Sequence, residues 1–132
     1  MNNIDNLIKN LNKEQKEAVL STEGPNLIVA GAGSGKTRVL TTRLINIINQ
    51  KKAWPNQILC VTFTNKAAKE MQSRVMSYIK GSSNAVPWLG TFHSISVKFL
   101  RRHAEALEYK SNFTILDTDD QKKLIRNIVK GE

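Results

Sequence analysis

A glycine-rich stretch constrains the fold of this chain most strongly. Glycines alternate with small residues at positions 31, 33 and 35, and Lys36 and Thr37 follow at once. The stretch lies between an apolar run at 26–30 and residues 36–50, whose apolar side chains recur at helical spacing. This order predicts a buried strand, a loop and a helix. Because glycine accepts positive φ, such a loop can point successive N–H groups at an anion beside the helix start.

The residue types match the P-loop pattern, which is glycine, four residues, then Gly-Lys-Ser/Thr. Ala30 fills the first position, and alanine is still small enough for the loop to leave the strand tightly. Lys36 is placed to reach the β- and γ-phosphates, and the Thr37 hydroxyl to bind Mg²⁺. These two residues are our catalytic candidates. The predicted nucleotide-binding residues of the loop are Ala30, Gly31, Ala32, Gly33, Ser34, Gly35, Lys36 and Thr37.

A dinucleotide-binding fingerprint, G-x-G-x-x-G, is the main rival interpretation of this loop. Gly31 and Gly33 fit it, but the third glycine position holds Lys36, which should block close packing of the helix on the strand. The next apolar run, "ILCVTF", ends in Thr64 and Asn65 and offers no carboxylate to hold a ribose. The pattern therefore favours the P-loop.

Further elements follow the loop in alternation. The periodicity and capping residues predict an α/β fold, with a parallel sheet covered by flanking helices. We expect that this sheet is incomplete, because the chain stops within a helical pattern, as if cut. The expected elements are a helix at 13–21 capped by Asn12, a strand at 57–63, a helix at 65–80 capped by Asn65 and ended by Gly81, a loop at 81–84, an extended segment at 86–92, a helix at 94–107, a short strand or turn at 113–117, and a last helix from Asp117 or Thr118.

Charge and composition limit the class of protein. The 132 residues carry a formal net charge of +9, which suggests a polyanionic partner or simply a solvated basic surface. No apolar run reaches the roughly 20 residues of a membrane helix, so no membrane association is expected. The single cysteine, Cys60, reads as a small buried hydrophobe that cannot form an internal disulfide. Together these features predict a cytoplasmic protein of unknown oligomeric state.

Three further stretches give the chain a specific resemblance. "LNKEQKEAV" (11–19) is similar to the Q-motif of superfamily 1 helicases, "VTFTNKAAKEM" (61–71) to their motif Ia, and "GTFHS" (90–94) to their motif Ib. With the P-loop, their order and spacing resemble the start of the UvrD/Rep/PcrA group, the bacterial 3′–5′ DNA helicases. The resemblance implies a RecA-like P-loop NTPase fold. Residues 1–107 would form part of domain 1A, and residues 108–132 the start of the inserted domain 1B.

The resemblance also implies individual roles at the nucleotide. Gln15 matches the glutamine that reads adenine, and a side-chain amide can both donate and accept there. Arg38 matches a position beside the nucleotide. Without the resemblance, both would be interpreted as ordinary polar surface residues. The implied cofactors are ATP and Mg²⁺.

For single-stranded DNA, the resemblance implies a second group of residues. Phe63 matches an aromatic residue that stacks on a base, although a core phenylalanine is the other interpretation. The histidine is the weaker member, because a lone histidine is more often simply hydrogen-bonded in place. The implied DNA-binding residues are Phe63, Thr64, Asn65, Lys66, Thr91 and His93.

Basic residues also share one helix face at Lys98, Arg101 and Arg102, spaced i, i+3 and i+4. This face could follow phosphates or could be solvated surface, and the sequence does not choose between the two.

An acidic DExx segment, which these helicases need, is absent from the sequence; "DTDD" (117–120) opens a helix and does not replace it. The predicted function is therefore the ATP-binding N-terminal portion of a DNA helicase that acts on single strands and single/double-strand junctions, in repair or replication. Alone, the chain is expected to be inactive. A stand-alone nucleotide- or DNA-binding module without hydrolysis is the alternative. A small-molecule kinase would leave "TFTNKAA" and "GTFHS" unexplained.

Overall fold

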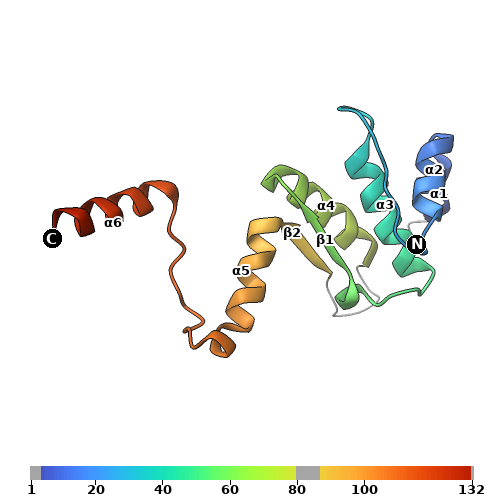
Figure 1. Cartoon of the computed structure of the whole chain (residues 1–132). Helices are drawn as coiled ribbons and strands as arrows, with labels where there is room; N and C mark the ends of the chain where they lie inside the picture. The colour runs from blue at the N-terminus through green and yellow to red at the C-terminus, as the bar shows by residue number, and fades with distance from the viewer. Residues whose placement is uncertain (1–3, 80–86, 132) are drawn as a thin grey trace. The chain divides into compact units, whose positions relative to one another are not determined.

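The computed structural model describes residues 4–79 and 87–131 (Figure 1). The chain divides into two compact units, residues 1–95 and residues 96–132, which we describe separately. Among the described residues, no helix combines the length and apolar character required to cross a membrane.

Strands and helices alternate, as the periodicity predicted, only between residues 59 and 102, and three helices precede the first strand of the described residues. The Asn12-capped helix, the helix after the glycine loop and the last helix are confirmed within one residue at their starts, whereas the first helix was not predicted. The elements are α1 (Ile4–Lys9), α2 (Lys13–Leu20), α3 (Lys36–Asn49), a 3₁₀ turn at Pro55–Gln57, β1 (Leu59–Thr62), α4 (Asn65–Ile79), β2 (Trp88–Thr91), α5 (Phe92–Arg102), a 3₁₀ turn at Ala104–Leu107, and α6 (Thr118–Lys130).

The two strands pair in parallel, as predicted. Their register runs from Leu59 opposite Trp88 to Thr62 opposite Thr91. A parallel pair needs a crossover, and α4 supplies it by packing against both strands (Figure 1). Because both strands run the same way, their carboxyl ends meet at one edge of the sheet. That edge is where ligands bind in open α/β sheets.

The core of the first unit lies between the sheet and the helices. Cys60 and Met71 meet there, sulfur to sulfur at 3.2 Å. Cys60 is only 6% exposed, which confirms the cysteine as a buried hydrophobe, and this burial raises the pKa of its thiol to about 11. A smaller cluster of Leu11, Val19 and Val39 joins α2 to α3. The main cluster consists of Ile4, Leu44, Ile45, Cys60, Met71, Val75, Ile79 and Leu89.

The apolar run at 26–30 is not the buried strand that the sequence predicted. Leu27 and Val29 are 91% and 90% exposed, and the sheet of the described residues contains only β1 and β2. An apolar pattern shows that side chains can be buried, but a strand also needs a neighbouring backbone to pair with. No such neighbour lies beside this segment in the described part of the chain. The segment therefore forms neither a helix nor a paired strand.

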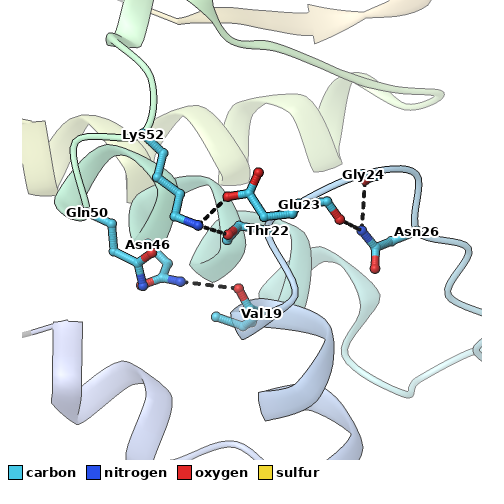
Figure 2. A network of polar contacts seen from close by, with 8 residues as sticks. All are labelled: Val19, Thr22, Glu23, Gly24, Asn26, Asn46, Gln50 and Lys52. Carbon is cyan, nitrogen blue, oxygen red and sulfur yellow. Dashed lines mark hydrogen bonds and ion pairs between the residues drawn. The ribbon is translucent and has the colours of Figure 1, made fainter.

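Polar side chains of α3 join it to the end of α2. The buried Asn46 donates from Nδ2 to the carbonyl of Val19 at 3.2 Å, and Arg43 donates to the carbonyl of Ala18 at 2.6 Å. These bonds satisfy carbonyl groups that the end of a helix leaves without an intrahelical partner. Beyond α2, Lys52 binds both the Glu23 carboxylate and the Thr22 hydroxyl (Figure 2). The pairing with Lys52 lowers the pKa of Glu23.

Most described side chains of the second unit are exposed. The helix predicted at 94–107 ends at Arg102 and continues as the 3₁₀ turn, and the segment at 113–117 forms no strand. Arg101 lies over the ring of Phe113, 5.7 Å from its centroid. The Asp117 carboxylate caps α6 by accepting from the backbone of Asp119 and Asp120. The predictions for Gly81 and the loop at 81–84 lie outside the described residues.

Candidate functional site

The glycine loop reverses direction in a tight turn before α3. Gly33 and Gly35 both take positive φ, at 75° and 84°, a conformation that side-chain-bearing residues rarely adopt. Ser34 closes the turn, because its backbone N–H and its hydroxyl both donate to the carbonyl of Gly31, at 3.3 and 2.7 Å. Gly31 itself does not need positive φ. The loop is thus shaped by two of its three glycines.

Lys36 folds back over this turn. Its ammonium donates to the carbonyls of Ala30 and Gly31, at 3.1 and 2.9 Å, while the side chain stays exposed. Gly35 is the N-cap of α3 and supplies no side-chain hydrogen bond to the first turn. The helix start therefore presents backbone N–H groups beside a lysine. This combination suits an anion such as a phosphate.

Gln15 contacts the same loop from α2. Its Nε2 donates to the carbonyl of Ser34 at 3.0 Å. Its Oε1 accepts from the backbone N–H of Asn12 at 3.1 Å, and the Asn12 side chain accepts from the Gln15 N–H at 2.8 Å, which makes a capping box. One amide hydrogen and one lone pair of the carbonyl oxygen remain for a ligand. The predicted adenine reader therefore lies directly against the predicted phosphate loop.

The remaining nucleotide candidates lie in the first turn of α3. Thr37 is half-buried, and its carbonyl accepts from the Thr41 hydroxyl at 2.7 Å. Arg38 is exposed and donates to the carbonyl of Asn10 at 3.1 Å, so it holds the chain that leads into α2. Ala32 stays exposed in the loop.

The end of β1 carries the first group of predicted DNA contacts. Phe63 is 87% exposed, which excludes the interpretation as a core phenylalanine within the described structure. Asn65 and Lys66 are also exposed and begin α4. The helix is capped by Thr64, whose hydroxyl accepts from the N–H of Ala67 at 3.2 Å. The predicted cap at Asn65 is therefore wrong by one residue. The Thr64 hydroxyl, one position earlier, accepts from an N–H group that has no partner within the first turn of the helix.

The end of β2 carries the second group. Thr91 is buried, and its hydroxyl accepts from the backbone N–H of Ser94 at 3.2 Å, so it caps α5. His93 is exposed in the first turn of that helix. Between them lies Phe92, which the sequence analysis missed. Its ring lies 5.1 Å from that of Phe63, centroid to centroid. The dipeptide Thr-Phe, which ends both the predicted strand at 57–63 and the predicted extended segment at 86–92, was the available signal.

Outside this unit, the basic face of Lys98, Arg101 and Arg102 is exposed. Among the described residues, no group of three or more histidine, cysteine or acidic side chains could hold a metal ion. The Thr37 hydroxyl is thus the metal-binding candidate that the loop offers. A single protein ligand is compatible with Mg²⁺, which is usually bound by few protein groups together with phosphates and water.

A parallel strand pair, a crossover helix and a glycine loop entering a helix define a P-loop nucleotide-binding protein of the α/β class. The family model described as "UvrD/REP helicase N-terminal domain" matches residues 11–132, and the chain belongs to this family. This confirms the resemblance seen in the sequence.

Curated relatives agree with this assignment. The chain is 53% identical over 126 residues to the ATP-dependent DNA helicase PcrA of Staphylococcus epidermidis strain RP62A, and 50% identical over 126 residues to PcrA of Staphylococcus aureus strain Mu50. In both comparisons the match covers 96% of this chain and 17% of the relative. The chain therefore spans about one sixth of the length of these helicases.

Proposed function

We propose that this chain is the ATP-binding N-terminal portion of a 3′–5′ DNA helicase, which couples ATP hydrolysis to movement along single-stranded DNA and to duplex unwinding. The observation that carries the proposal is the meeting of two distant motifs at one loop. Lys36 and Gln15 lie 21 positions apart, yet both bind carbonyl groups of the glycine loop. A loop that served only as a connection would need neither the Lys36 ammonium nor a hydrogen bond from Gln15, which lies on a different helix, α2.

In this proposal the loop holds the phosphates of ATP. The ammonium of Lys36, now on loop carbonyls, moves to the β- and γ-phosphates, and the N–H groups at the start of α3 bind the same oxygens. Gln15 reads adenine with its remaining donor and acceptor, which match N7 and the N6 amine. Mg²⁺, when bound through the Thr37 hydroxyl and the phosphates, offsets charge that develops during phosphoryl transfer.

Single-stranded DNA is proposed to bind at the carboxyl edge of the sheet. Phe63 supplies an exposed ring for base stacking, and Lys66, Asn65 and His93 supply polar groups near it on the two strand ends. The net charge of +9 favours a polyanionic partner. Junctions between single and double strands are the substrate class that unwinding implies.

The proposed division is domain 1A for residues 1–107 and the start of domain 1B for residues 108–132. We further propose a cytoplasmic role in DNA repair or replication. The sequence contains no acidic DExx segment, and the match covers only 17% of the PcrA relatives, so we assign hydrolysis to a longer protein of this kind.

The test compares the full-length protein with the 132-residue chain. The full-length protein should hydrolyse ATP when single-stranded DNA is added, and Lys36→Ala should abolish turnover. Lys13→Ala, an exposed lysine in α2, is the matched control and should leave the rate unchanged. The 132-residue chain should show no turnover. ATP hydrolysis at a few per second by this chain, abolished by Lys36→Ala, would contradict the proposal.

A further inference from the structure

The ends of β1 and β2 place two phenylalanine rings in contact. Thr62 and Thr91 are partners in the parallel register, and each is followed by phenylalanine. The rings of Phe63 and Phe92 lie 5.1 Å apart between centroids, with 40° between their planes. This distance is within the range of a favourable aromatic pair.

Neither ring belongs to the core. Phe63 is 87% exposed and Phe92 is 46% exposed, and both are outside the two buried clusters of the described residues. The less exposed ring is the one on the helix, and it lies against the more exposed one. An exposed aromatic pair at the ligand edge of a sheet is a candidate binding surface rather than a part of the core.

The backbone on both sides of the pair is held in place. Thr64 follows Phe63 and caps α4, while Thr91 precedes Phe92 and caps α5. Gly90 makes the passage from β2 to α5 tight, because a Cβ at this position would lie 2.5 Å from the Ser94 hydroxyl oxygen. The backbone beside both rings is therefore fixed by hydrogen bonds of the two helix caps, and such preorganisation reduces the entropy lost when a ligand binds.

We propose that Phe92 is a positioning residue for single-strand binding: it supports the Phe63 ring from one side, so that an unpaired nucleobase stacks on the open face of Phe63. This inference rests on the proposed function, because it takes single-stranded DNA as the ligand. A base does not enter between the rings, since two stacking contacts need about 7–8 Å, more than the 5.1 Å observed.

The experiment measures binding of the full-length protein to a fluorescein-labelled oligothymidine at several salt concentrations. Phe63→Ala should weaken binding about 5- to 150-fold. Phe92→Ala should weaken it about 3- to 10-fold, and Phe92→Tyr should restore it. In the Phe63→Ala background, Phe92→Ala should have no further effect. The slope of log K against log salt should not change in any of these variants, because no phosphate contact is removed.

Phe99→Ala is the matched control, because Phe99 is another exposed phenylalanine of α5, and binding should be unchanged. If Phe92→Ala lowers the melting temperature, Phe92→Leu keeps an apolar side chain but not the ring, and it should still bind weakly. Normal binding by Phe92→Ala or by a folded Phe92→Leu, with weak binding by Phe63→Ala, would overturn the inference and leave the proposed function intact. Additive losses in the double variant would also overturn it. If the unmodified protein does not bind the oligothymidine, the proposed function itself fails.

Discussion

The side-chain amide of Gln15 donates to the backbone carbonyl of Ser34 at 3.0 Å, across 19 positions of sequence. The same amide accepts from Asn12 at the start of α2. One glutamine thus connects a helix cap to the glycine loop. Its observed capping and its proposed reading of the nucleotide can be separated by experiment, because Asn12 shares only the capping.

We expect the full-length protein to prefer ATP or dATP over GTP, because guanine presents O6 where adenine presents an N6 amine. Gln15→Ala should remove this preference and should also lower the free energy of unfolding by about 0.5–2 kcal/mol. Asn12→Ala should lower stability by a similar amount and keep the preference. The measurements are kcat/KM for both nucleotides and urea unfolding. Equal kcat/KM for ATP and GTP in the unmodified protein would show that Gln15 acts only as a cap.

Gly35 and Gly33 form a matched pair for testing the loop. Both have positive φ, but a Cβ on Gly35 would lie 3.2 Å from Nε2 of Gln15, whereas one on Gly33 would meet nothing within 4 Å. Alanine at either position should cost about 1–2 kcal/mol of backbone strain. Gly35→Ala should cost more than Gly33→Ala, and the difference should disappear in the Gln15→Ala background. Equal unfolding free energies for the two single variants would contradict the contact.

Stacking and charge should separate at the end of β1. Phe63→Ala should weaken single-strand binding by about 1–3 kcal/mol without changing the salt slope. Lys66→Ala should reduce that slope by up to about one unit, because a phosphate contact releases counterions. Since Phe63 is 87% exposed, its removal should leave the melting temperature nearly unchanged. A large fall in melting temperature with normal affinity in the cold would refute the stacking role.

Burial of Cys60 should make stability depend on pH. Its pKa is raised from 9.0 to about 11 in the folded chain, so between these values the unfolded chain loses a proton that the folded chain keeps. This contribution is fully present below pH 9 and is lost as pH rises toward 11. The free energy of unfolding should be lower at pH 10 than at pH 8. This fall should be about 1 kcal/mol larger in the unmodified chain than in Cys60→Ala. The same pH dependence in both would show that Cys60 is not responsible.

Local sequence signals were sufficient for most helices. Asn12 caps its helix as predicted, and the last helix begins where it was predicted, with Asp117 as its cap. A capping side chain bonds to N–H groups two or three residues away, so such signals are local. The missed α1 is a six-residue helix, too short for a clear period. The cap of α4 was misplaced by one residue because Thr64 and Asn65 are both good capping residues and only the coordinates distinguish them.

The sequence by itself determined the glycine loop, the helix after it and the apolar runs, because these depend on residues close together in the chain. Only the tertiary structure decided which runs pair: 57–63 contains a strand with a partner, while 26–30 has none among the described residues. It also brought Gln15 to Ser34 and Phe92 to Phe63. The physical reason is that hydrogen bonds between distant segments, and the register of parallel strands, depend on where the backbone places each partner, which no local pattern encodes.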